Sequence, residues 1–368
     1  ETGVDQIKDF TVSINRVAQE DIDVSFSATH NSAVATDDYV AGTTSGTILA
    51  GTSSTTIPIT IVGDDIVEPQ EDFTGAIVVS NAYGQTINNG TLSRTITIND
   101  DDNATIAINS PAAETEGNVI DFTVSLTGSV QNEFTIDYLT GDDSAAEPGD
   151  YTAITATTLT FGDEQDASQT VSVTTNDDVE IEPQETFFVN LQNLTPGGQN
   201  ITNTVTQGAG TINDNDQATL AVSNPTVSEN GTSVSFSISL TGTAKNEISI
   251  DYTTTDNDAE AGKDYFATSG TLYFGGANTS PKTVTVNIID NSVVEPDESF
   301  YLDFSGLTTN GQDVVMPDTQ GECTITDDDS AVLTITDRSV NESTGTTKLT
   351  VELSEDVQNA FTLQYQTA

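Results

Sequence analysis

Apolar and polar residues alternate in short runs along the whole chain, and these runs are rich in Thr, Val, Ile, Tyr and Phe. In "KTVTVNII" (282–289), for example, Val284, Val286 and Ile288 fall on one face. Alternation of this kind predicts β-strands that bury one face. Turn residues separate the runs, and no stretch shows helical periodicity of useful length. The pattern therefore predicts short strands throughout.

Three motifs recur along the chain at intervals of about 113 residues. They are Asp-Tyr at 38–39, 150–151 and 264–265, Glu-Pro at 68–69, 182–183 and 295–296, and acidic triplets at 100–102, 214–216 and 327–329. Solenoid repeats run about 20–50 residues, so this period is too long for a solenoid. Each unit is therefore expected to be a domain in its own right.

The period predicts four segments: repeat one (1–102), which lacks its first strand, repeat two (103–216), repeat three (217–329), and a truncated start of repeat four (330–368). The predicted fold class is all-β, as tandem immunoglobulin-like antiparallel β-sandwiches of about seven strands each. In repeat three, strands are expected at 218–224, 233–240, 247–254, 269–274, 282–289, 299–304 and 322–326.

The charge balance excludes several classes of partner. The chain has 58 acidic and 8 basic residues, a formal charge of −50. Nucleic acid is excluded because phosphate binding needs clustered Lys and Arg, and anionic membranes are disfavoured for the same reason. No apolar run approaches 18 residues, so this segment is not expected to insert directly into a membrane.

The residues needed for common catalytic and redox chemistry are scarce. The chain has a single histidine, His30, a single cysteine, Cys323, and no tryptophan. A hydrolytic triad cannot recur in each repeat without histidine, and no nucleotide-binding motif is present. We therefore expect a non-catalytic protein. Cys323 is expected to be a buried small residue, because one cysteine cannot form a disulfide within the chain.

The acidic residues are predicted to gather at one end of each sandwich. Alternating strands place the A–B, C–D and E–F connections and the end of the last strand at the same end. Two unit charges about 4 Å apart repel by roughly 4 kcal/mol at an effective dielectric near 20. Calcium takes 6–8 oxygen ligands, whereas magnesium prefers fewer protein ligands and zinc prefers His or Cys. The sequence therefore predicts Ca2+ as cofactor, with several ions per repeat.

The chain resembles the Calx-beta domain family in three stretches. These are "GKDYFATSGTLYF" (262–274), "IIDNSVVEPDESFYLDF" (288–304) and "CTITDDD" (323–329), and the resemblance extends over all three copies and the fragment. It implies the following calcium ligands: Asp38, Asp64, Asp65, Glu68, Glu71, Asp100, Asp101 and Asp102 in repeat one; Glu116, Asp150, Asp177, Asp178, Glu182, Glu185, Asp214 and Asp216 in repeat two; Glu229, Asp264, Asp290, Glu295, Glu298, Asp327, Asp328 and Asp329 in repeat three; and Glu342 in the truncated copy.

Some positions depart from this ligand set. Asn291 stands where repeat two has Asp178, Asn215 interrupts an acidic triplet, and Gly63 replaces the acid found at Asp177. Repeat one also has no counterpart to the Glu that follows the first strand. We therefore expect fewer or weaker ions in some repeats. The tyrosines of the Asp-Tyr motifs are expected to be core anchors rather than ligands.

The position of the acidic triplets suggests a role for the ions. Each triplet immediately precedes the first strand of the next repeat, as in "INDDDNATIAI". Calcium bound there is expected to stiffen the junction and turn a monomeric chain of sandwiches into a rod. The partners are then neighbouring repeats of the same chain. The repeats resemble those of very large bacterial surface adhesins, including gliding-motility adhesins of Bacteroidetes (SprB type) exported by type IX secretion. That resemblance implies an extracellular stalk at the bacterial cell surface.

Two other functions remain open from the sequence. A ligand-binding module for a glycan or a host protein would use a variable loop such as 306–320. A regulatory calcium sensor, as in sodium–calcium exchangers, would need flanking membrane helices and usually a pair of domains.

Overall fold

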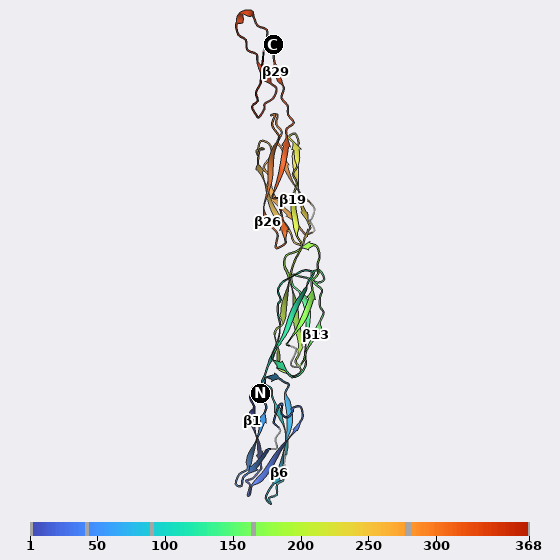
Figure 1. The fold of residues 1–368 in the computed structure, drawn as a ribbon, viewed down its shortest axis with the longest axis vertical. Coiled ribbons are helices and arrows are strands. Elements are labelled where there is room, and N and C mark those ends of the chain that lie inside the picture. Colours follow the sequence, from blue (N-terminus) through green and yellow to red (C-terminus); the bar gives the residue numbers. More distant parts are fainter. Residues whose placement is uncertain (1–2, 41–43, 89–91, 163–166, 277–280, 367–368) are drawn as a thin grey trace. The chain divides into compact units, whose positions relative to one another are not determined.

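The computed structural model describes residues 3–40, 44–88, 92–162, 167–276 and 281–366 (Figure 1). Contacts divide the chain into two compact units, Glu1–Asn176 with Thr186–Ile212, and Asp177–Glu185 with Asn213–Ala368. The described ranges contain no α-helix, and the single helical element is a 3-10 turn. No described helix has the length and apolar character to cross a membrane. The expected all-β class is confirmed.

Repeat one lies in the first unit and forms two facing sheets. Its strands are β1 (Gln6–Ser13), β2 (Ile22–His30), β3 (Thr44–Ile48), β4 (Ser54–Ile61), β5 (Ile66–Val67), β6 (Glu71–Asn81) and β7 (Ser93–Ile98). One sheet has the order β3-β2-β6-β7, and β1 pairs with β4 in the other. Their inward faces meet in a core that includes Phe26, Ile57 and Phe73. Burial alternates along β2 and β6, as period-2 patterning requires.

Repeat two repeats this plan with additional strands. They are β8 (Ala104–Ile108), β9 (Glu114–Thr115), β10 (Val119–Thr127), β11 (Ser129–Val130), β12 (Phe134–Asp142), β13 (Thr157–Phe161), β14 (Ser168–Thr174), β15 (Glu180–Ile181), β16 (Glu185–Thr195), β17 (Ile201–Val205) and β18 (Gln207–Asn213). The two sheets have the orders β14-β10-β8-β17 and β13-β12-β16-β18-β9. Phe122, Phe187 and Val189 belong to the core between them.

Repeat three, in the second unit, has the same topology, and Figure 1 labels its β19 and β26. Its strands are β19 (Ala218–Val222), β20 (Thr226–Ser228), β21 (Ser233–Thr241), β22 (Thr243–Ala244), β23 (Ile248–Asp256), β24 (Ser269–Phe274), β25 (Lys282–Asn287), β26 (Glu298–Thr308), β27 (Val314–Val315) and β28 (Gln320–Thr326). The sheets have the orders β25-β21-β19-β27 and β20-β28-β26-β23-β24. Residues 330–366 contribute β29 (Leu333–Ile335), the 3-10 turn η1 (Glu342–Thr344) and β30 (Val351–Leu353).

The first strand of a repeat is divided between the two sheets, which the seven-strand interpretation did not include. In repeat three, β19 pairs with β21, whereas β20 pairs in parallel with β28 of the other sheet. Pro225 stands between the two pieces, and its carbonyl accepts a hydrogen bond from the Thr324 N–H at 3.1 Å. Proline has no N–H to donate to a ladder, so the chain can leave one sheet there and enter the other.

The tyrosines of the Asp-Tyr motifs are core anchors, as expected. Each ring is at most 1% exposed and stacks on a phenylalanine of the strand that follows the E–F connection. The centroid separations are 4.0 Å for Tyr39 and Phe73, 4.5 Å for Tyr151 and Phe187, and 4.1 Å for Tyr265 and Phe300. The stacks hold each preceding Asp in a fixed place above the core.

The tyrosine hydroxyls also fasten the C–D connection. Tyr151 and Tyr265 donate to Asp142 and Asp256, each at 2.6 Å, whereas Tyr39 pairs with His30 Nδ1 at 3.1 Å. Burial and the Asp142 bond raise the pKa of Tyr151 to about 12. The hydroxyls therefore stay protonated and keep donating over the physiological pH range.

Cys323 is buried in the repeat-three core with no exposed surface, and burial raises the pKa of its thiol to about 12. The equivalent position in repeat two is Gly210, where a Cβ would lie 2.6 Å from the Phe187 ring. This place on the last strand therefore demands a small or adaptable side chain, in agreement with the sequence-based interpretation of Cys323.

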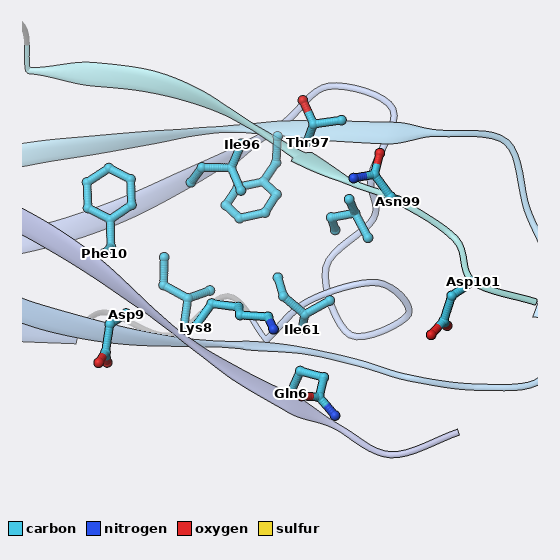
Figure 2. A pocket seen from close by; sticks show the side chains of 12 residues that line it. Gln6, Lys8, Asp9, Phe10, Ile61, Ile96, Thr97, Asn99 and Asp101 are labelled. Carbon is cyan, nitrogen blue, oxygen red and sulfur yellow. The ribbon is translucent and has the colours of Figure 1, made fainter. Parts of the chain in front are cut away.

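A groove of about 500 Å³ opens between the sheets of repeat one, and Phe10, Ile61 and Ile96 line it (Figure 2). Figure 2 shows Asp101 at the end of the groove away from Phe10. Residues 97–99 of its wall are equivalent to Thr324–Thr326, with which β20 pairs in repeat three. The groove thus lies where repeats two and three carry the second half of their divided first strand.

The hydrogen bond from Tyr265 to Asp256 is expected to stabilise the C–D connection. Tyr265→Phe keeps the ring stack but removes the bond to Asp256, and hydrogen bonds to charged groups contribute about 1.5–3 kcal/mol. Hydrogen exchange of the amides at 259–266, measured by mass spectrometry, should accelerate by about tenfold or more. Tyr273→Phe is the control, since Tyr273 is 52% exposed. Equal exchange in the two variants would contradict the anchoring role.

Candidate calcium sites

The four acidic segments of repeat three meet around one small cavity. Parallel pairing of β20 with β28 makes both strands end together, which brings Glu229 next to Asp327. The cavity measures about 10 Å³, close to the smallest volume that holds one water-sized particle. The acidic residues that line it are Glu229, Asp264, Glu295, Glu298 and Asp327. They come from the A–B, C–D and E–F connections and from the end of the last strand.

Glu229 is the central carboxylate of this group. It is 4% exposed, and one oxygen each of Glu229, Asp327 and Asp329 lie within 4.8 Å of one another. The Asn291 N–H donates to Glu229 Oε1 at 3.0 Å, and the Asn291 amide donates to Glu295 Oε2 at 3.2 Å. Asn291 therefore links two candidate ligands although it lacks the charge that repeat two has at this position.

In repeat one, acidic residues of the C–D and E–F connections form another cluster. Asp38, Glu68 and Glu71 are 4%, 8% and 9% exposed, and one oxygen from each lies within 4.8 Å of the others. The Asp38 carboxylate accepts a hydrogen bond from the Val34 N–H, which closes the C–D connection on itself. Asp100 Oδ2 accepts the Glu68 N–H at 3.1 Å. The end of the last strand and the E–F connection are thereby tied together.

The candidate ligands of repeat two are divided between the two units. Glu116 and Asp150 belong to the first unit, where Glu116 is buried and Asp150 Oδ2 accepts the Ala146 N–H at 2.6 Å. In the second unit, Asp214 Oδ2 accepts the Glu182 N–H at 3.0 Å, as Asp100 does in repeat one. Asp177 Oδ1 accepts the Asn215 side-chain amide at 3.1 Å. Asn215 thus supports a neighbouring carboxylate.

Other predicted ligands have local or solvent-facing roles. Asp64 and Asp178 accept the N–H of the residue two positions ahead, Ile66 and Glu180, at 2.8 and 2.7 Å. Six of the predicted ligands in the three repeats are exposed: Asp65, Asp101, Asp177, Asp178, Asp290 and Asp328. Glu342 is exposed in η1.

Among the residues that the structure describes, one oxygen of the last Asp in each triplet is buried without a hydrogen-bond partner. These atoms are the Oδ2 atoms of Asp102, Asp216 and Asp329. A buried carboxylate oxygen without a donor is unfavourable and points to a missing partner. The same atom is left without a donor in all three triplets. The oxygen-only donor set, the small cavity and these three atoms all fit a calcium ion.

Burial and mutual repulsion raise the pKa values of several carboxyl groups in these clusters. Burial first, and then the neighbouring triplet carboxylates, raise the pKa of Asp102, Asp216 and Asp329. Burial, with smaller contributions from Glu295, Asp327 and Asp329, raises the pKa of Glu229 to about 7. Metal-free clusters therefore favour protons, whereas a cation would favour the ionised form.

Three residues that sequence reasoning missed contact these acids from the following repeat. Gln131 donates to Glu68 Oε1 at 2.6 Å, and Gln358 donates to Glu298 Oε1 at 2.7 Å. Between them in sequence, the Lys245 ammonium lies 2.7 Å from Glu182 Oε1 and 2.9 Å from Glu185 Oε1. The signal was available, because the three residues recur at the repeat period and Lys245 is one of only eight basic residues.

Comparison with known proteins identifies the class. A model of the Calx-beta domain family matches residues 3–102, 99–216, 211–329 and 327–368. The chain therefore belongs to the Calx-beta family. Domains of this family are non-catalytic calcium-binding modules, and the acidic clusters are compatible with that activity.

Among curated proteins, the chain is similar to sodium/calcium exchanger 2 of rat, with 33% identity over 156 residues, 38% of this chain and 17% of the exchanger. Sodium/calcium exchanger 1 of dog is 35% identical over 71 residues, 19% of this chain and 7% of the exchanger. The chain thus spans less than a fifth of the length of these relatives. The crystal structure of the apo-form Calx CBD1 domain matches 30% of this chain and 98% of its own, with 25% identity and a TM-score of 0.28.

The raised pKa of Glu229 predicts a pH dependence for calcium-depleted protein. Its folded-state pKa of about 7 exceeds the usual 4.5, so its stabilising contribution is complete below pH 4.5 and is lost as the pH rises through 7. At about 1.4 kcal/mol per pKa unit, repeat three should lose about 3 kcal/mol between pH 4.5 and pH 8. Thermal melting at both pH values checks this. Unchanged or rising stability would contradict it.

Proposed function

We propose that this chain is a calcium-stabilised, rod-like stalk segment of a large cell-surface adhesin. The observation that carries the proposal is the coincidence of two features at the same end of repeat one and of repeat three. The carboxylates gather there, and the contacts with the following repeat are made by the same E–F segment. A cation held among these carboxylates would therefore act on the fold of a repeat and on its connection to the next one.

The residues of the chain prepare each cluster to hold calcium, which would supply the positive charge that the clusters need. Asp100 and Asp214 hold the E–F segment through the N–H groups of Glu68 and Glu182. Tyr265 fixes the C–D connection that carries Asp264. The side chains that would ligate calcium are thus positioned by contacts that need no ion. This lowers the entropy that the chain loses on binding.

The junctions are short and built from backbone pairing. In the first unit β5 pairs in parallel with β11, and Val294 forms a parallel bridge with Val357 in the second unit. These pairs comprise two residues or fewer, so they are sensitive to the charges beside them. The large acidic excess supports an extracellular setting, where calcium is abundant. We propose that the protein acts in surface adhesion. More specifically, we propose that it serves gliding motility and is exported by type IX secretion.

Replacement of Glu229 by Gln should have opposite effects with and without calcium. In calcium-depleted protein at pH 8 the variant should be more stable by about 3 kcal/mol, because it removes a buried charge. In saturating calcium it should be less stable than the wild type, because a charged ligand is lost. Thermal melting with calcium, magnesium and chelator measures both.

The control for that experiment is Glu322→Gln, which makes the same charge change at an exposed position on β28. It should leave melting in all three conditions close to that of the wild type. A Glu229 variant that melts lower than the wild type in calcium-depleted and calcium-loaded protein alike would show a packing role rather than an ion ligand.

Calcium removal should also change the dimensions of the whole chain. Without cations the clustered carboxylates repel one another, so the junctions should bend and the maximum dimension in small-angle X-ray scattering should fall. Limited proteolysis should then cut near the acidic triplets at 100–102, 214–216 and 327–329. Equal maximum dimensions and equal cleavage patterns with calcium and with chelator would contradict the stalk proposal.

A second candidate function is a regulatory calcium sensor, favoured by the similarity to sodium/calcium exchangers. Affinity separates the two candidates, because calcium sensors bind at about 10⁻⁷–10⁻⁵ M and extracellular modules at about 10⁻⁴–10⁻³ M. A calcium titration by isothermal calorimetry therefore discriminates them. Direct ligand binding through loop 306–320 is the third candidate, which alanine replacement in that loop and a surface-attachment assay would test.

A further inference from the structure

The E–F segment of each repeat meets the following repeat through one recurring position. The backbone N–H groups of Gln131, Lys245 and Gln358 donate to the carbonyls of Val67, Ile181 and Val294, each at 3.0 Å. The side chain of the same residue also contacts one or both of the glutamates on either side of the Glu-Pro proline. The position therefore makes two contacts at once, one to the backbone and one to the candidate calcium ligands.

The residue at this position is neutral at two junctions and positively charged at the third. Gln131 and Gln358 present a neutral amide, whereas Lys245 presents a positive charge to two carboxylates. Glu182 and Glu185 are 10% and 7% exposed in their side chains, and Lys245 is 32% exposed. The two carboxylates are thus largely shielded from water, and hydrogen bonds between charged groups are stronger than those between neutral groups.

Residues Asp177–Glu185 belong by sequence to repeat two, but their contacts place them in the second unit with Lys245. The parallel pair of β15 with β22 and the Gly311–Pro183 contact lie beside the ion pair. A Cβ on Gly311 would approach Pro183 Cβ to 3.2 Å. The segment is therefore held by backbone pairing, close packing and a fixed positive charge, and none of these needs an ion.

We propose that Lys245 acts as a built-in cation that keeps segment 177–185 docked on repeat three when calcium is absent. The equivalent segments 63–71 and 290–298 have the same backbone contacts but meet a neutral glutamine, so their docking depends more strongly on calcium. The predicted difference between segment 177–185 and the other two segments rests on the proposed calcium binding. A calcium ion that used Glu182 and Glu185 would also have to displace the ammonium, so this pair takes up calcium more weakly than its counterparts.

Hydrogen exchange of the full chain, with calcium and with chelator, tests this proposal. In the wild type, chelator should accelerate exchange of the amides at 63–71, 290–298, Gln131 and Gln358, and leave 178–185 and Lys245 nearly unchanged. Lys245→Gln should make 178–185 exchange about tenfold faster or more in chelator, since bonds between charged groups contribute about 1.5–3 kcal/mol. Gln131→Lys should protect 63–71 in chelator, and Lys348→Gln controls for loss of one positive charge elsewhere.

The outcomes separate this inference from the proposed function. If chelator opens 178–185 in the wild type as much as 63–71, or if Lys245→Gln leaves 178–185 unchanged, the inference is wrong. If no segment of the wild type responds to calcium, the proposed function fails. Acceleration of 178–185 by Lys245→Gln in chelator would then still establish Lys245 as the docking cation. A calcium titration of Lys245→Gln should also show tighter binding than the wild type by about tenfold.

Discussion

Electrostatic repulsion among carboxylates is the constraint on which the architecture of each repeat depends. Repeat three places five acidic side chains around a cavity of about 10 Å³, in a chain whose formal charge is −50. Backbone N–H groups and side-chain amides such as Asn291 satisfy some of the oxygens. Within the described part of the chain, the last Asp of each triplet has one buried oxygen that accepts no hydrogen bond. The strands and the tyrosine anchors hold these charges together, so the stability of the fold is coupled to whatever neutralises them.

Much of the fold could be predicted because two periods are visible in the chain, one of two residues and one of about 113. Alternating apolar residues locate the strands, and the long period shows that each copy repeats them. The division of the first strand at Pro225 was not predicted, since its two halves together have the pattern of one strand. Convergence of the acids in repeat three followed from the order of the strands, because consecutive connections alternate between the two ends of a sandwich.

The contacts of Gln131, Lys245 and Gln358 could not be predicted by considering each repeat alone. The stretch "TGTAKNE" has few acids and lies at the opposite end of its own sandwich. Its role becomes visible only when the E–F segment of the preceding copy is placed beside it. The copies thus share one backbone arrangement and differ in single charged residues. The tyrosine hydroxyl, for example, pairs with His30 in repeat one but with Asp142 or Asp256 in the other two repeats. Each copy can be adjusted electrostatically without a change of fold.

The recurring position at 131, 245 and 358 makes the junctions between repeats interchangeable during evolution. Both halves of a junction come from constant places in every copy, so any copy can follow any other. Recombination that removes or duplicates one whole copy therefore leaves each remaining boundary with a complete set of backbone partners. The length of the array is free to vary in steps of about 113 residues, while a single codon decides whether a given link carries its own positive charge.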